Sequence, residues 1–181
     1  MRIQRKEKNG IVLDFLPHGH PFKGDRSPVA QILGQDFFTL LEVAPKRDVI
    51  LKQGDIVYLG PDKRDKIHHV SGRISSLDLT QTAKIELDSF VTDLVEKKKD
   101  FFLNFFNKSG PISMRLHQLE LLPGIGKKHM WKLLDERKTD PFKSFDDIKK
   151  RIELIPDPKK MIIKRIIDEM SETDKYKIFV G

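Results

Sequence analysis

The stretch "LELLPGIGKKHMWKLL" (residues 119–134) decides how the second half of this chain folds. An apolar run breaks at Pro123, which lacks an N–H group and restricts the residue before it. Gly124 and Gly126 follow, and glycine adopts backbone angles that other residues resist. A new helical pattern begins at Lys127. The stretch therefore predicts a tight hairpin between two helical segments.

The predicted hairpin also suits an anion. A helix that begins here leaves its first amides without intrahelical partners, and the positive end of its dipole attracts negative charge. Adjacent lysines add to that charge, and the glycines carry no side chain to obstruct a ligand. We predict that a nucleic-acid backbone phosphate binds here, without sequence readout. The predicted contact residues are Gly124, Ile125, Gly126, Lys127, Lys128 and His129.

The hairpin sequence is repeated 33 residues later. The segment "ELLPGIGKKHMWKLLDE" (120–136) aligns without a gap to "ELIPDPKKMIIKRIIDE" (153–169). We interpret each copy as helix, hairpin, helix, and Ser144 as the N-cap of the first helix in copy two. Copy two lacks the glycines, since Asp157 would repel a phosphate and Pro158 has no N–H to donate. Copy two is therefore predicted to be structural. Positive charge that supports phosphate binding at the first hairpin is predicted at Lys132, Lys159, Lys160, Lys164 and Arg165.

Two further residues near the hairpin have predicted roles. Trp131 follows helical spacing and is predicted to lie in the core, although exposure beside the hairpin would make it a candidate for base stacking. His117, just ahead of the hairpin, is predicted to pack against or cap a helix.

The first half of the chain has the pattern of short strands. Apolar or alternating runs at 10–16, 29–34, 37–44, 55–60 and 66–75 are separated by turn residues. Five such strands favour a small barrel, because closure removes exposed edges. The final run, 175–181, is predicted to be a strand that returns to this barrel. We divide the chain into a barrel (1–77), connecting helices (78–107), paired hairpins (108–174) and the closing strand (175–181).

At residue 78 the hydrophobic period changes to that of a helix. Apolar residues fall on one helical face, with Asp78 or Thr80 as candidate caps. The face consists of Ala83, Leu87, Phe90, Val91, Leu94 and Val95. A cluster of four aromatic residues follows and is predicted to be core rather than a base-stacking platform: Phe101, Phe102, Phe105 and Phe106. From residue 113 to the closing strand, a wholly helical structure is predicted.

The segment "LPGIGKK" resembles the helix-hairpin-helix motif, and the two copies resemble the paired form of that domain. The resemblance implies phosphate contacts through the amides of Gly124, Gly126, Lys128 and His129. In some members of the motif family, hairpin carbonyls also bind a monovalent cation. The corresponding carbonyls here are those of Glu120, Leu122 and Ile125. Met130 departs from the motif, which usually has alanine at this position.

A wider resemblance covers nearly the whole chain. "VLDFLPHGHP", "FFTLLEV", "RLHQLELLPGIGKK" and "PFKSFDDIKKRI" together resemble an uncharacterised archaeal family regarded as nucleic-acid- or RNA-binding. That family joins an OB-like barrel to a helix-hairpin-helix region, so the resemblance implies an α+β fold of this kind. The hairpin motif favours DNA and the wider resemblance slightly favours RNA.

Composition agrees with a polyanionic partner. The 181 residues carry a formal net charge of +7, with 17 basic against 15 acidic residues in 1–107 (+2) and 17 against 12 in 108–181 (+5). The chain contains no cysteine, which excludes disulfides and thiolate chemistry. No run approaches the roughly 20 apolar residues of a membrane span. We expect a cytoplasmic protein that is not associated with a membrane.

Catalytic signals are weak. No P-loop, GxSxG or HExxH pattern occurs, and we expect a non-enzyme without cofactor, metal or small-molecule substrate. His18 and His20 alone are a poor zinc site. A cryptic metal-dependent nuclease would need Asp14, Asp25 and Asp36 to cluster. The other alternative is a protein-interaction module of a ribosome- or nucleic-acid-processing complex.

Overall fold

A computed structural model describes residues 6–21, 23–171 and 173–181 of the chain. The fold is mixed α+β and consists of two compact units. The first, the sheet unit, contains the described residues of 1–91 and 167–181. The second, the helical unit, contains residues 92–166.

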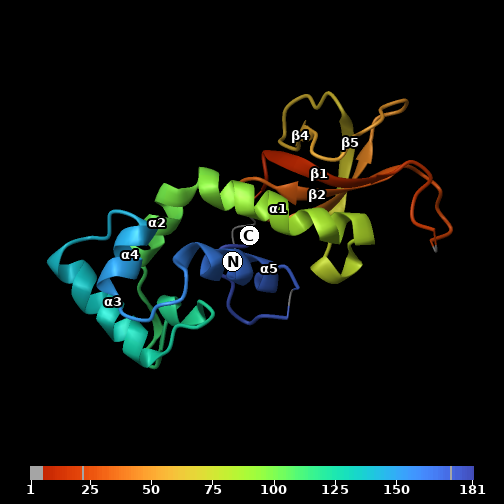
Figure 1. Cartoon of the computed structure of the whole chain (residues 1–181). Helices are drawn as coiled ribbons and strands as arrows, with labels where there is room; N and C mark the ends of the chain where they lie inside the picture. The colour runs from red at the N-terminus through yellow and green to blue at the C-terminus, as the bar shows by residue number, and fades with distance from the viewer. Residues whose placement is uncertain (1–5, 22, 172) are drawn as a thin grey trace. The chain divides into compact units, whose positions relative to one another are not determined.

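Five antiparallel strands form the sheet, in the order β4-β1-β2-β3-β5 (Figure 1). All five predicted strands are present. Within the described residues β4 and β5 do not pair, so the sheet is a curled half-barrel with two edges, and the predicted closure is not seen. The strands are β1 (Asn9–Leu16), β2 (Val29–Gly34), β3 (Leu40–Pro45), β4 (Ile56–Tyr58) and β5 (Ile67–Arg73).

The inner face of the curled sheet is apolar and fully buried at Val12, Ile32 and Val43. The pairing of β1 with β2 shifts register between Val12 and Asp14, which is the kind of bulge that bends a strand. Gly10 lets the two strands approach closely, because a Cβ atom at this position would lie 2.2 Å from Cγ2 of Ile32. These two features account for part of the curl.

Helix α1 (Gln81–Lys97) confirms the predicted change of period. Its predicted apolar face is buried, apart from Phe90, which is half-buried. The Thr80 hydroxyl accepts a hydrogen bond from the Ala83 amide (3.1 Å) and donates one to Asp14 (2.6 Å), so Thr80 is the cap. Asp78 instead closes a capping box with Ser75 around the short 3-10 helix η1 (Ser76–Asp78).

The predicted closing strand at 175–181 is wrong, because the described residues of this segment form no strand. The Glu169 carboxylate, fully buried at the end of α5 (Pro158–Glu169), accepts hydrogen bonds from the amides of Ile178, Phe179 and Val180 at 2.8–2.9 Å. The Glu169 carboxylate thus accepts the hydrogen bonds that these amides would donate to a neighbouring strand in a sheet. One backbone hydrogen bond, from Gly181 N–H to the Phe37 carbonyl (2.9 Å), does return the tail to the sheet unit.

The helical unit contains two elements that the sequence reading missed. A small β-hairpin, β6 (Pro111–Ser113) and β7 (Leu116–His117), precedes the 3-10 helix η2 (Gln118–Leu121). The region after residue 113 is therefore not wholly helical, and the first arm of copy one is a single 3-10 turn. The remaining helices are α2 (Lys99–Lys108), α3 (Lys127–Thr139) and α4 (Phe145–Arg151), together with the start of α5.

Helix α2 carries the aromatic cluster. Phe102 and Phe106 are fully buried, which confirms the predicted core role for these two residues. Phe105 is half-buried, whereas Phe101 is 60% exposed and lies outside the core. In the described part of the chain, no helix combines the length and apolar character that crossing a bilayer requires.

Candidate nucleic-acid interface

The loop between η2 and α3, residues 122–126, is named here the glycine turn. Gly124 has a φ of 86°, which L-residues with a side chain rarely adopt. A Cβ atom at Gly124 would lie 2.8 Å from Cγ of Pro156, so the second copy packs directly against this glycine. The absence of a side chain at Gly124 thus serves packing as well as backbone geometry, which the sequence reading did not anticipate.

Gly126 is the N-cap of α3 and differs from Gly124. Its backbone is extended (φ −98°, ψ −174°), and no atom lies within 4 Å of a Cβ built on it. No side chain caps α3, and the amides of Lys127, Lys128 and His129 have no acceptor among the described residues. The start of α3 is therefore open, as an anion site requires.

The amide of Ile125 is not part of this open set. It donates a hydrogen bond to the Leu122 carbonyl (3.1 Å), and the Ile125 side chain is buried. The Ile125 amide is therefore engaged inside the turn, and the predicted phosphate contact at Ile125 stays a prediction. The Leu122 carbonyl, which accepts this bond, has a second lone pair with which it can bind a cation. The monovalent cation site at the carbonyls of Glu120, Leu122 and Ile125 stays a prediction.

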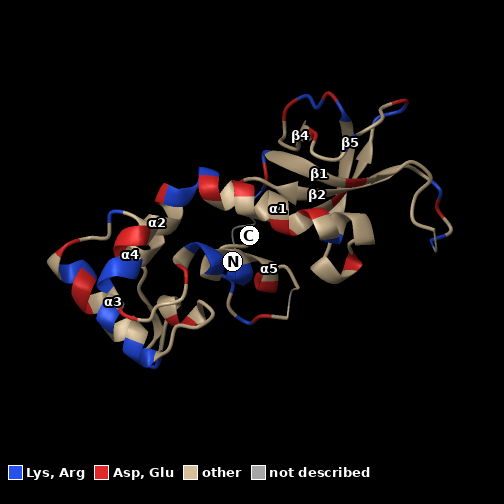
Figure 2. Cartoon of the chain, in the orientation of Figure 1, with Lys and Arg blue, Asp and Glu red and all other residues tan. Residues whose placement is uncertain are grey.

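Helix α3 begins with basic residues, and its ribbon is blue there in Figure 2. The two lysines at this start have different surroundings. Lys127 Nζ contacts the Glu120 carboxylate (2.8 Å) and donates a hydrogen bond to the Arg115 carbonyl (2.9 Å). Hydrogen bonding to Lys127 is the main cause of the lowered pKa of Glu120. Lys128 is exposed and forms no ion pair with any described residue. Lys128 is therefore the cation best placed to meet a ligand.

Two residues extend the same surface along α3. Trp131 is 59% exposed, so the predicted core position is wrong and the alternative, an exposed ring beside the turn, holds. It lies three residues after Lys128, a spacing that places both on one helix face. Lys132 shares this face but pairs with Glu136 (2.9 Å). His129 is half-buried, and its Nε2 lies 3.3 Å from the Glu153 carbonyl.

The corresponding loop of copy two, residues 152–157, is named here the aspartate turn. Asp157 Oδ1 accepts a hydrogen bond from the Lys160 amide at 3.0 Å, so the chain's own carboxylate occupies the start of α5. Burial alone would raise the pKa of Asp157, but the Lys160 amide and the nearby Lys149 charge lower it. The aspartate turn is therefore closed to a phosphate, in agreement with its predicted structural role.

The predicted supporting charges separate into three groups. Lys160 and Lys164 are exposed. Lys159 pairs with Glu96 at 2.6 Å. Arg165 is only 8% exposed, so its guanidinium is not part of the accessible positive surface.

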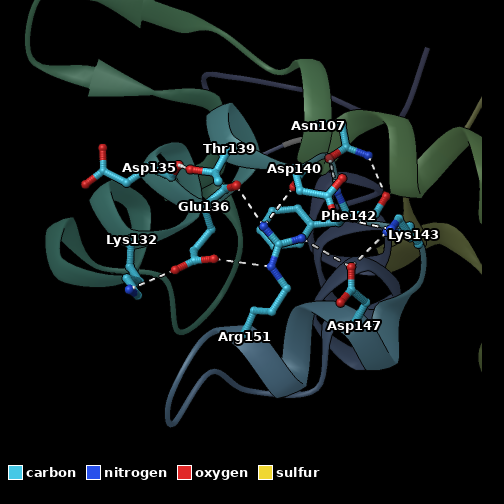
Figure 3. Close-up of polar contacts among 10 residues, drawn as sticks. All are labelled: Asn107, Lys132, Asp135, Glu136, Thr139, Asp140, Phe142, Lys143, Asp147 and Arg151. Carbon is cyan, nitrogen blue, oxygen red and sulfur yellow. Dashed lines mark hydrogen bonds and ion pairs between the residues drawn. The ribbon is translucent and has the colours of Figure 1, made fainter.

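Arginines hold the scaffold of the helical unit together. Arg151, from α4, donates two 2.7 Å hydrogen bonds to the Glu136 and Asp140 carbonyls at the end of α3 (Figure 3). It also pairs with Glu136 (3.2 Å) and Asp147 (3.3 Å), and its guanidinium lies 4.6 Å from the centre of the Phe142 ring. This network fixes the end of α3 relative to α4.

Caps set the helix boundaries on either side. The Ser144 side chain accepts the Asp147 amide (3.0 Å), which confirms the predicted N-cap of α4. His117 Nδ1 accepts the Leu119 amide (3.1 Å), so its predicted capping role is also confirmed. Burial, followed by the charge of Arg137, lowers the pKa of His117.

The weaker candidate sites do not assemble. His20 Nε2 lies 2.5 Å from Glu42 Oε2, whereas His18 is exposed. Asp14 accepts a hydrogen bond from the Thr80 hydroxyl, Asp25 accepts one from the Ser27 amide, and Asp36 accepts one from the Lys8 amide. Among the described residues, no group of three or more histidine, aspartate or glutamate side chains is placed to hold a metal ion.

Sequence reasoning missed a hollow in the sheet unit, with a volume of about 260 Å³. Its lining comes from separate stretches between residues 6 and 73, and no motif links them. Only the curl of the sheet brings these stretches together.

Comparison with known proteins places the chain in a family. The family described as "Protein of unknown function (DUF655)" matches residues 6–181. The chain belongs to the DUF655 family. A DUF655 relative described as "Uncharacterized protein MJ0038", from Methanocaldococcus jannaschii, is 46% identical over 179 residues, which are 98% of this chain and 81% of the relative.

A solved DUF655 structure shares the fold. The crystal structure of Af1531 from Archaeoglobus fulgidus matches with a TM-score of 0.82 and 41% identity, over 97% of this chain and 100% of that one. The predicted resemblance to a family with archaeal members is confirmed.

Proposed function

We propose that the protein binds nucleic acid by gripping the phosphate backbone at the glycine turn, and that it does so without catalysis. One observation carries the proposal. Helix α3 begins with three amides that lack an acceptor among the described residues, whereas the Asp157 carboxylate caps the start of α5. A phosphate oxygen would accept hydrogen bonds from those amides and lie at the positive end of the helix dipole. The glycine turn would thus act as a helix-hairpin-helix contact.

Side chains around the turn support the same role. Lys128 supplies a cation without a carboxylate partner in the described chain, and Trp131 supplies an exposed ring on which a base can stack. Neither contact reads a sequence. Binding is therefore expected to tolerate changes of sequence. It should weaken steeply with rising salt, because binding releases condensed counterions from the nucleic acid and this release is less favourable at a higher salt concentration.

The sheet unit would give a second surface. Five curled antiparallel strands, unpaired between β4 and β5, support the proposal of an OB-like fold, which is a partly open five-stranded barrel. OB-folds often bind single strands. The wider family resemblance is the ground on which we favour RNA slightly over DNA.

The proposal is tested by Gly126→Asp, which imitates the closed start of α5. Residue 126 has ordinary extended angles and room for a side chain, and aspartate is a slightly better N-cap than glycine, so stability should hold or rise by roughly a few tenths of a kcal/mol. The carboxylate would occupy the phosphate position. We expect affinity for 20-mer RNA to fall at least tenfold, measured by fluorescence anisotropy.

The matched control is Gly110→Asp, which makes the same change of charge at another glycine with free space around its Cβ position. It should bind as the unmodified protein does. Single- and double-stranded RNA and DNA are compared from 50 to 300 mM salt. Equal affinity of a folded Gly126→Asp protein and the control would show that the glycine turn is not the contact.

A protein-interaction module remains the second candidate, because large apolar side chains are exposed in the helical unit. Met114 is fully exposed, and Leu154 is 85% exposed. If no RNA or DNA binds even at 50 mM salt, this reading is favoured over the first.

A further inference from the structure

The hollow in the sheet unit has the composition of a ligand pocket. It is lined from both edges of the open sheet, by β5 and by residues just after β4, with the start of β3 between them. The inner wall is apolar and consists of Leu41, Leu59 and Val70. A volume of about 260 Å³ lies just below the roughly 300–1,000 Å³ of typical ligand sites, which limits the occupant to a small molecule.

Three cations line the same hollow: Lys6, Arg64 and Arg73. None of them pairs with a carboxylate among the described residues, and the one hydrogen bond found for the Arg64 side chain uses Nε, which donates to the Gly60 carbonyl (2.9 Å). The two terminal nitrogens of the Arg64 fork therefore have no acceptor found in the described chain. Arginine forks match the oxygens of a phosphate in a bidentate manner.

The carboxylate of Glu7 also lines the hollow but does not neutralise these cations by pairing with them. Its two oxygens accept hydrogen bonds from the backbone amides of Asp36, Phe37 and Thr39 at 2.7–3.1 Å. The Glu7 carboxylate thus holds the loop that precedes β3. The hollow keeps an excess of positive charge.

One buried polar atom in this lining lacks a partner. Thr39 is only 4% exposed, and its Oγ1 forms no hydrogen bond within the described structure. An unpaired buried hydroxyl is costly, and such groups in native proteins call for an explanation. A bound oxygen-rich ligand would supply the missing partner.

We propose that this hollow binds a phosphomonoester carried on a small ring compound, of the size of one nucleoside monophosphate. The phosphate would meet the arginine forks and Lys6, the ring would lie against the apolar wall, and Thr39 would hydrogen-bond the ligand. The same chemical group occurs in free mononucleotides and at the 5′-phosphorylated end of a strand. The site is separate from the glycine turn and does not depend on nucleic acid binding there.

The test is isothermal titration calorimetry of the full chain with the four nucleoside monophosphates and with adenosine as the unphosphorylated control. We expect at least one monophosphate to bind in the micromolar range and adenosine to bind at least tenfold more weakly. Binding of strand ends is measured in the same way with a 5′-phosphorylated and a 5′-hydroxyl tetranucleotide. This titration uses the Gly126→Asp protein, in which the glycine turn is expected to be blocked. A preference for the 5′-phosphate there, with no mononucleotide binding, assigns the hollow to strand ends.

Three variants localise the binding. Arg73→Ala should weaken the monophosphate at least tenfold, while Arg26→Ala, an exposed arginine outside the lining, should leave affinity unchanged. Thr39→Val removes only the hydroxyl; since that hydroxyl has no described partner, the thermal midpoint should not fall, but affinity should drop several-fold.

Amide chemical shifts give a second measurement that needs no variant. On titration with the monophosphate, Thr39 and Val70 should shift and Lys128 should not. The proposal is overturned if neither a monophosphate nor the 5′-phosphorylated strand binds at 1 mM. It is also overturned if folded Arg73→Ala binds as well as Arg26→Ala.

Discussion

The glycine turn and the aspartate turn come from the same repeated sequence, yet they differ in what fills the start of the following helix. In the first, Gly126 leaves the amides of α3 without a cap; in the second, Asp157 caps α5 with its own carboxylate. The two turns also touch, because the ring of Pro156 packs on Gly124. The comparison teaches that two copies of one sequence can differ at a helix start, which is capped in one copy and open in the other.

The backbones of the two turns differ as well. The left-handed residue is Gly124 in the first copy and Leu154 (φ 57°) in the second. These positions do not correspond in the aligned repeat, where Gly124 matches Asp157. Similar sequence has thus produced two different turn geometries, and this difference can be tested residue by residue.

The largest expected effect is that of Gly124→Val. A branched side chain would force a left-handed backbone and collide with Pro156, so we expect a loss of about 2–4 kcal/mol in the free energy of unfolding. Urea denaturation followed by circular dichroism measures it. Gly126→Ala is the control and should cost less than about 1 kcal/mol, since its angles are ordinary and its surroundings open. Equal losses would remove the distinction between the two glycines.

A smaller effect is expected for Asp157→Ala, which removes the cap of α5. The loss should be about 1 kcal/mol at pH 7. Because the folded state lowers the pKa of Asp157 below 3.8, the ionised carboxylate stabilises the fold above pH 3.8, and this contribution disappears as pH falls through the folded pKa.

Urea denaturation at pH 7, 4 and 2.5 checks this pH dependence. The difference between the unmodified protein and Asp157→Ala should be constant down to about pH 5 and should shrink towards pH 2.5. Asp135→Ala, an exposed site, serves as the control and should show little change. A difference that stays constant to pH 2.5 would argue against a charged cap.

The smallest expected effect is a gain. Leu154 is 85% exposed, so its replacement loses little packing, and asparagine tolerates the left-handed region better than leucine does. Leu154→Asn should therefore raise stability by about 0.5 kcal/mol. Leu121→Asn, at the aligned position of copy one, has no positive φ to relieve and should not stabilise. Equal effects in the two variants would mean that the turn backbones are more alike than they appear in the structure.

Much of the fold could be predicted from local pattern. Strand runs, the helical face from Ala83 to Val95, the Ser144 cap and the break at Pro123 depend on neighbours close in sequence, and all are present. The errors lie where a distant group decides. The tail 175–181 looks like a strand, but the Glu169 carboxylate takes its amides. Trp131 has helical spacing, yet the face it occupies is exposed.

The candidate site divides in the same way. The open start of α3 could be predicted, because glycine spacing and a following helix are local features. The internal pairing of Lys127 with Glu120 and the burial of Arg165 could not, because burial and partners are set by packing. The hollow with Thr39 had no sequence signal at all, since its lining is scattered along the chain.

The sequence by itself determined the element types, the repeat and the excess of positive charge, because these follow from backbone preferences and side-chain chemistry over short spans. Only the tertiary structure decided which of the repeated turns stays open, which of the two lysines at the start of α3 forms an ion pair, and which arginines line the hollow with its apolar wall. Those outcomes depend on contacts between residues far apart in sequence, and such contacts form only when the apolar faces pack.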